Sequence, residues 1–289
     1  MFSHTLFSLP FAMIAMLLAA EGLPPFEIFI WIIVALFAGR NGANSLNRYI
    51  DADIDAKNAR TASRHIPTGK IKKIDALVIA VICFAVFVFA AAMINRLCLL
   101  LSPVALALFI AYSFTKRFTW MCHVILGVTC AGAPVGAWIA VTNGFHYIPL
   151  IFAAAVTLWI AGFDIIYATQ DIEFDRAEGL FSVPARFGLK GSLRIAACMH
   201  IVMWGLLLAL FFLTELSWIY LAAVVTSGAL LIVEHLSVDP ARRDKMNLAS
   251  YNLNQAIGVL LLLAVVLDMI FLWPDNAVGK YLTEARLCL

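Results

Sequence analysis

Long apolar stretches, separated by shorter polar segments, follow one another along almost the whole chain. A helix needs about 20 predominantly apolar residues to cross a bilayer. The pattern predicts nine membrane-spanning helices, at residues 4–20, 26–46, 74–94, 98–114, 119–141, 147–168, 193–213, 216–236 and 254–273. No low-complexity segment or long linker interrupts the series. We therefore expect a single all-α membrane domain over residues 1–289.

The composition agrees with this pattern and excludes several classes of protein. Hydrophobic residues make up 63% of the chain and charged residues only 13%, whereas a soluble domain has about 45–50% apolar and about 25% charged residues. The net charge of +2 gives no reason to expect a nucleic-acid partner. The six cysteines and six histidines form no CxxC, HxxxH or HExxH pattern, so a zinc site is not expected.

Positive charges are concentrated in four of the connections between the apolar stretches. Residues 47–73, 115–118, 170–194 and 237–253 contain 16 of the 20 lysine and arginine residues. Positively charged connections stay on the cytoplasmic side of a membrane. These four connections, and any active site built from them, are therefore expected to face the cytoplasm.

Two acidic motifs lie in these basic connections. The first contains Asn47, Asp51 and Asp55, and the second contains Asp171 and Asp175. Residues four apart share one helix face, and we interpret both motifs as extensions of the preceding membrane helices. One such motif alone is usually a solvated helix end. Two such motifs on the same side of a membrane favour a functional role. Together their carboxylate and amide oxygens form a site that suits Mg²⁺ bound with a substrate diphosphate.

Two further charged residues lie deeper in the predicted membrane helices. Arg40 precedes Asn47 by seven residues, about 10 Å along a helix, and Asp164 precedes Asp171 by the same number. An arginine at that depth needs an anionic partner or a wet cavity. Arg40 is explained either by an internal salt bridge or snorkelling, or by binding of a substrate carboxylate.

Basic side chains follow the acidic motifs on the same expected side of the membrane. Arg60 and Arg64 come soon after Asp55, and Tyr112 and Lys116 lie four residues apart at the end of the fourth apolar stretch. Arginine binds phosphate in a bidentate manner, and lysine acts as a point charge. The tendency of positive residues to stay inside would explain each one alone, but their coincidence with a candidate metal site favours diphosphate recognition.

Together these residues resemble the UbiA superfamily of intramembrane aromatic prenyltransferases. That superfamily has an NDxxDxxxD motif, a DxxxD motif and a YxxxK motif between them. The corresponding residues here are Asn47, Asp51 and Asp55, then Asp171 and Asp175, and Tyr112 and Lys116. Arg48 stands where the first aspartate is usual. Segments 47–69 and 167–171 resemble the 4-hydroxybenzoate polyprenyltransferase branch in particular.

The resemblance implies nine helices around a central cavity with a cytoplasmic helical cap, in a bacterial inner membrane. It implies Mg²⁺-dependent transfer of a polyprenyl group from polyprenyl diphosphate to an aromatic carboxylic acid in quinone biosynthesis. The implied catalytic residues are Asp51, Asp55, Asp171 and Asp175, which together with Asn47 are the implied metal ligands. The implied substrate-binding residues are Arg40, Asn47, Arg60, Arg64, Tyr112, Lys116 and Asp164.

Two alternatives to this reading stay open. 4-Hydroxybenzoate, a ubiquinone precursor, is the favoured acceptor, but a dihydroxynaphthoate-type acid from menaquinone biosynthesis is also an aromatic carboxylate and would suit Arg40 equally. A more distant alternative is an ion-coupled transporter. Transporters place their charged sites near the membrane midplane, whereas both acidic motifs here are expected at the cytoplasmic edge.

Overall fold

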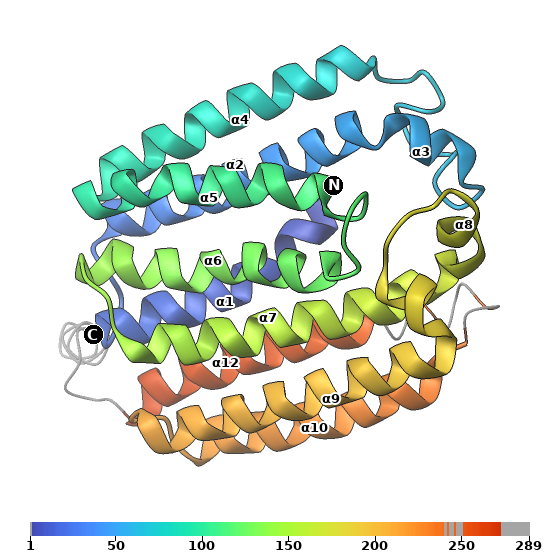
Figure 1. The fold of residues 1–289 in the computed structure, drawn as a ribbon. Helices are drawn as coiled ribbons and strands as arrows, with labels where there is room; N and C mark the ends of the chain where they lie inside the picture. Colours follow the sequence, from blue (N-terminus) through green and yellow to red (C-terminus); the bar gives the residue numbers. More distant parts are fainter. Residues whose placement is uncertain (1, 240–241, 243–245, 247–250, 273–289) are drawn as a thin grey trace.

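The computed structural model is helical throughout the described chain, which comprises residues 2–239, 242, 246 and 251–272. Its elements are α1 (Phe2–Ala20), α2 (Phe26–Ile50), α3 (Ala52–Lys57), α4 (Lys73–Ile94), α5 (Arg96–Thr115), α6 (Cys122–Thr142), α7 (Tyr147–Ala168), the 3₁₀ turn η1 (Thr169–Asp171), α8 (Ile172–Ala177), α9 (Val183–Leu213), α10 (Trp218–Ser237) and α12 (Leu253–Leu272). The long helices run side by side (Figure 1). The described residues contain no β-strand, which confirms the predicted all-α class.

Eight of the described helices are long and apolar enough to cross a membrane, where the pattern predicted nine. They are α2, α4, α5, α6, α7 counted with η1 and α8, α9, α10 and α12. The predicted first span, 4–20, falls within α1 (Phe2–Ala20), which is not among these eight. Each predicted span therefore coincides with a described helix.

Short polar side chains determine where several of these helices begin. Asn95 precedes α5, and its side chain accepts a hydrogen bond from the backbone N–H of Cys98. Ser182 and Ser217 accept backbone hydrogen bonds in the same way at the starts of α9 and α10. Such caps satisfy N–H groups that a helix leaves unpaired in its first turn.

Helix α9 begins well before the predicted residue 193, because a short first turn precedes a kink. Gly188 at the kink has φ 66° and ψ 179°, a backbone conformation that residues with a side chain disfavour. The first turn is tied to α8, since Arg176 Nε donates to the carbonyl oxygen of Ala185 at 2.8 Å. The kink thus lets α9 continue from the connection that carries the second acidic motif.

The apolar core lies between α1, α6, α7, α9, α10 and α12. At its centre Phe11 packs edge-on against Trp159, with ring centroids 4.8 Å apart. On the outer surface, large apolar side chains such as Phe212, Trp218 and Leu236 are exposed. An extensive apolar exterior of this kind is typical of a surface that faces lipid.

The short helices α3, η1 and α8 lie together at one end of the bundle (Figure 1). α3 follows α2, whereas η1 and α8 follow α7. Lys57 at the end of α3 contacts Glu178 just after α8, with Nζ and Oε2 2.6 Å apart. The two acidic connections therefore meet at the same end of the molecule, as predicted.

We predict that Gly127→Ala destabilises the protein, because α6 and α7 approach each other closely at this residue. A Cβ atom at Gly127 would lie 2.3 Å from the backbone oxygen of Thr157, so the two helices would have to separate. Overpacking of this kind costs about 1–3 kcal/mol and lowers the melting temperature of the purified protein in detergent.

Gly205→Ala is the matched control, since a Cβ atom at that position meets nothing within 4 Å. Equal melting temperatures for Gly127→Ala and Gly205→Ala would contradict the close approach of α6 and α7.

Candidate active site

A cavity of about 580 Å³ reaches from the end that carries α3 and α8 into the helix bundle. Its wall contains every residue predicted for the site: Arg40, Asn47, Asp51, Asp55, Arg60, Arg64, Tyr112, Lys116, Asp164, Asp171 and Asp175. These residues come from α2, α3, α5, α7, η1, α8 and the connections that directly follow α2, α3 and α5. Residues far apart in the sequence therefore share one cavity.

The first acidic motif lies at a bend, not on a straight extension of α2. Helix α2 ends at Ile50, Asp51 has φ −91° and ψ 4°, and α3 begins at Ala52. Asn47 and Asp51 nevertheless remain neighbours, because Asn47 Nδ2 donates to Asp51 Oδ2 at 3.0 Å. The predicted continuous helix is therefore wrong, although the bend keeps Asn47, Asp51 and Asp55 in the cavity wall.

The second acidic motif is interrupted in a similar way. Helix α7 ends at Ala168, Asp171 closes the 3₁₀ turn η1, and Asp175 lies on the separate short helix α8. Ser182, the cap of α9, donates its hydroxyl to Asp175 Oδ2 at 2.7 Å. Ser182 therefore both caps α9 and holds the Asp175 carboxylate in the site.

Basic side chains neutralise both carboxylates of the first motif. Lys116 Nζ lies 2.8 Å from Asp51 Oδ2, and Arg117 Nη2 lies 2.9 Å from Asp51 Oδ1. Arg64 Nη1 donates to Asp55 at 2.7 Å. Asp51 and Asp55 are only 3% and 4% exposed, and carboxylates buried to this degree need such partners.

Arg60 neutralises Asp171 of the second motif through two parallel hydrogen bonds. Its Nε donates to Asp171 Oδ1 at 2.9 Å and its Nη2 donates to Oδ2. Its Nη1 donates to the hydroxyl of Tyr167 at 3.1 Å. Burial lowers the pKa of Arg60, but the hydrogen bond and charge of Asp171 outweigh burial and raise this pKa above its usual value. The guanidinium group therefore stays charged.

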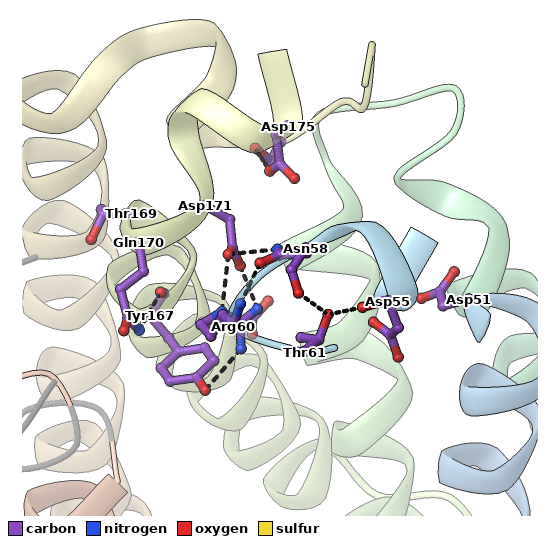
Figure 2. Close-up of polar contacts among 12 residues, drawn as sticks. Asp51, Asp55, Asn58, Arg60, Thr61, Tyr167, Thr169, Gln170, Asp171 and Asp175 are labelled. Atoms are coloured by element: carbon purple, nitrogen blue, oxygen red, sulfur yellow. Dashed lines mark hydrogen bonds and ion pairs between the residues drawn. The ribbon is translucent and has the colours of Figure 1, made fainter. Parts of the chain in front are cut away.

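The connection after α3 lies between the two acidic motifs. Figure 2 shows Asn58, Arg60 and Thr61 between Asp171 on one side and Asp55 on the other. Asn58 Nδ2 donates to Asp171 Oδ1 at 2.9 Å, and Thr61 Oγ1 donates to the backbone oxygen of Asp55 at 2.9 Å. This connection therefore joins the two acidic motifs through hydrogen bonds.

The acidic side chains supply the oxygen donors that Mg²⁺ prefers, but they do not form a complete cage. Within the described part of the chain, no group of three or more His, Cys, Asp or Glu side chains is placed to hold a metal ion. Arg48, at the usual position of a further aspartate, instead brings its Nη1 within 3.5 Å of Asp55 Oδ2. Mg²⁺ is usually bound by one or two carboxylates together with substrate phosphates. The donor set therefore fits a cation that is bound jointly with a diphosphate.

The deeper part of the cavity contains polar atoms that lack partners. Arg40 Nη1 donates to Cys130 Sγ at 3.1 Å, but Arg40 Nε and Asn44 Nδ2 are buried without a hydrogen-bond partner among the described residues. The internal salt bridge considered for Arg40 does not occur in that part of the chain. Unpaired buried polar atoms are rare, so this region suits a polar ligand. The surrounding wall includes the apolar side chains of Leu36, Phe87, Leu108, Phe109, Leu126 and Phe163.

Two charged contacts at the cavity were not anticipated from the sequence. Arg117 pairs with Asp51, yet in the sequence it counts only as one more positive charge beside Lys116. His123 Nδ1 lies 2.6 Å from Asp164 Oδ2, yet an isolated histidine has no informative spacing. Only the packing of α6 against α7 brings His123 and Asp164 together.

Comparison with known proteins agrees with this fold. The model of the UbiA prenyltransferase family matches residues 8–257. A 4-hydroxybenzoate octaprenyltransferase of Serratia proteamaculans is 28% identical, with 88% of this chain and 87% of that one covered. The enzyme of the same name from Aeromonas salmonicida is 30% identical over 88% of this chain and 87% of its own length.

Solved structures of the family have the same helical architecture. The apo structure of a UbiA homologue from Aeropyrum pernix K1 superposes with a TM-score of 0.83 at 32% identity, over 92% of this chain and 98% of that one. A UbiA homologue from Archaeoglobus fulgidus bound to DMAPP and Mg²⁺ superposes with a TM-score of 0.67 at 20% identity, over 91% and 93%. The chain therefore belongs to the UbiA prenyltransferase family and is an integral membrane prenyltransferase.

We predict that Asn58→Ala destabilises the protein, because Asn58 joins the connection after α3 to the second acidic motif. Besides its bond to Asp171, its Oδ1 accepts the backbone N–H of Arg60 at 2.9 Å. Loss of these bonds at a site only 8% exposed costs about 1–3 kcal/mol, measured as a lower melting temperature in detergent.

The matched control is Asn41→Ala, which removes an asparagine that donates only to Phe37 O within its own helix α2. If Asn41→Ala lowers the melting temperature as much as Asn58→Ala, the connecting role of Asn58 is wrong.

Proposed function

We propose that this enzyme catalyses Mg²⁺-dependent transfer of a polyprenyl group from polyprenyl diphosphate to an aromatic carboxylic acid. The favoured acceptor is 4-hydroxybenzoate, which would place the enzyme in ubiquinone biosynthesis. One observation supports this proposal above the others: a single cavity combines two acidic motifs and several basic residues with an apolar wall and Arg40, whose Nε is buried. The names of the relatives from Serratia and Aeromonas support the same acceptor.

The diphosphate of the donor would bind at the charged end of the cavity. Bound Mg²⁺, held by Asp51, Asp55, Asp171 and Asp175 with Asn47 nearby, would neutralise the diphosphate and assist its departure. In the structure, Arg60, Arg64 and Lys116 are engaged by these carboxylates. With a cation bound by the carboxylates, these basic groups would be free to bind phosphate oxygens and would stabilise the charge of the leaving group.

The remainder of the cavity suits the reacting carbon and the acceptor. Apolar side chains such as Phe109 and Phe163 line it and would keep water from an allylic cation. Arg40 would bind the carboxylate of the aromatic acid through its charged group, since its Nε lacks a partner among the described residues. Tyr112 and Asp164 line the same region and would orient the ring.

The membrane arrangement is also part of the proposal. We infer nine spans, with α1 as the ninth, and a helical cap formed by α3, η1 and α8. The basic connections support a cytoplasmic position for this cap, in a bacterial inner membrane. The expected partners are the two substrates and the lipid bilayer, without nucleic acid, and we treat residues 1–289 as one domain.

The direct test is prenyl transfer by the purified protein in lipid, with Mg²⁺ and a short allylic diphosphate. 4-Hydroxybenzoate and a 1,4-dihydroxynaphthoate-type acid are supplied as competing acceptors. We expect a prenylated product chiefly from 4-hydroxybenzoate, and no product when EDTA is present. Preferred transfer to the naphthoate would reassign the acceptor to menaquinone biosynthesis. Absence of product from both acids, in a folded protein, would contradict the proposed reaction.

Two substitutions within the first acidic motif provide a matched pair for this assay. We predict that Asp51→Asn lowers the transfer rate by about 100-fold or more, because it removes a charge that faces the bound cation. Asp53→Asn should have little effect, since the Asp53 side chain is 84% exposed and pairs with Lys73 outside the cavity. Equal losses in the two variants would contradict the assignment of Asp51 to the site.

A further inference from the structure

A histidine and an aspartate that belong to neither acidic motif face each other in the cavity wall. His123 lies in the first turn of α6 and Asp164 in the last turns of α7. His123 Nδ1 and Asp164 Oδ2 are 2.6 Å apart. An ionised carboxylate only accepts hydrogen bonds, so the imidazole N–H donates to Asp164. Both residues line the cavity.

The two partners differ in their access to the cavity. The side chain of His123 is 4% exposed, whereas the side chain of Asp164 is 29% exposed. His123 Nε2 is buried and has no hydrogen-bond partner in the described structure. A histidine kept for packing alone normally satisfies its ring nitrogens. The contact with Asp164 therefore explains why residue 123 is a histidine. Because His123 contacts Oδ2, the other carboxylate oxygen, Asp164 Oδ1, is left for a ligand.

The pair also lies at a suitable distance from Arg40 along α6. Arg40 contacts Cys130, and His123 precedes Cys130 by seven residues on the same helix, which is about 10 Å. Arg40, Tyr112 and Asp164 all line the same cavity. An aromatic ring with a carboxylate and a hydroxyl at opposite ends, and a hydrogen bond of about 2.7–3.0 Å at each, covers a span of that order.

We propose that Asp164 accepts the proton of the acceptor's phenolic hydroxyl, and that His123 is a positioning residue that fixes the Asp164 carboxylate for this step. The inference rests on the proposed transfer to an aromatic acid and adds the group that activates the ring. Because Asp164 Oδ2 is held by His123, Oδ1 is directed to the ligand. Positioned proton acceptors contribute about 10²–10⁴-fold to a rate.

The chemistry of this step balances without a further reactant. The bond between C1 of the prenyl chain and the diphosphate oxygen breaks, and its electron pair leaves with the diphosphate. A ring carbon beside the hydroxyl forms the new carbon–carbon bond with a ring electron pair, while the hydroxyl proton passes to Asp164 Oδ1. The ring carbon then loses its proton to the diphosphate, its electrons restore the aromatic ring, and Asp164 returns a proton to the oxygen.

Two substitutions of similar shape at His123 test the positioning role. Asparagine can donate from a position close to that of the imidazole Nδ1, whereas leucine cannot. We expect His123→Leu to lower kcat for 4-hydroxybenzoate by about 100-fold and His123→Asn to recover most of the loss, with KM for the allylic diphosphate unchanged in both. His65→Gln is the control for loss of an imidazole, since His65 is exposed and lies outside this cavity.

A fluorinated acceptor tests the proton transfer itself and does not require the leucine variant to fold. Fluorine beside the hydroxyl of 4-hydroxybenzoate makes that hydroxyl more acidic, so a larger share is ionised at the assay pH and needs no proton acceptor. The measured quantity is the transfer rate with the fluorinated acid divided by the rate with 4-hydroxybenzoate. This ratio should be at least about tenfold higher in Asp164→Asn than in the wild type, because the proton acceptor is expected to contribute about 100-fold or more to the rate with 4-hydroxybenzoate.

The outcomes separate this inference from the proposed function. Suppose that the wild type transfers prenyl groups. If His123→Asn and His123→Leu then have equal rates, or if the rate ratio of Asp164→Asn equals that of the wild type, the pair does not act in proton transfer, and the proposed function stands. If the wild type prenylates no phenolic acid although it binds the allylic diphosphate, the proposed function and the inference are both wrong.

Discussion

The negative charge gathered at one end of the helix bundle is the constraint on which the rest of this structure depends. Asp51 and Asp55 are almost fully buried, and such carboxylates are stable only when basic groups or a cation neutralise them. In the structure, Lys116 and Arg117 neutralise Asp51, and Arg64 neutralises Asp55. Arg60 does the same for Asp171 of the second motif. These are also the groups that a diphosphate would attract, so in the proposed function the compensation of charge and the recognition of substrate would use the same side chains.

The fold is arranged to bring these charges together. The acidic groups come from two connections separated by more than a hundred residues, and the basic groups come from the connection after α3 and the end of α5. Asn58 and Thr61 link the two acidic motifs by hydrogen bonds (Figure 2), while Ser182 links Asp175 to the start of α9. Beyond the charged end, the apolar wall and the unpaired Nε of Arg40 provide a second, different environment for an aromatic acid.

Much of this arrangement could be predicted from the sequence, because periodic and repeated features determine it. Apolar length located the helices, the distribution of lysine and arginine indicated that the acidic motifs share one end, and i, i+4 spacing identified Asp51, Asp55, Asp171 and Asp175. The bend at Asp51 and the kink at Gly188 were not predicted, because apolar length locates a helix but not a break in its backbone. The sequence also did not predict the pairing of His123 with Asp164, because this contact arises only when α6 packs on α7.

The central claim is that the basic residues exchange their carboxylate partners for a diphosphate when a cation is present. Binding of Mg²⁺ and of an unreactive allylic diphosphate analogue, measured by calorimetry on the protein in lipid, tests this claim directly. Each ligand should bind at least about tenfold more tightly when the other is present, because the coupling between two sites is reciprocal. Mg²⁺ that binds equally well with and without the diphosphate analogue would contradict the account.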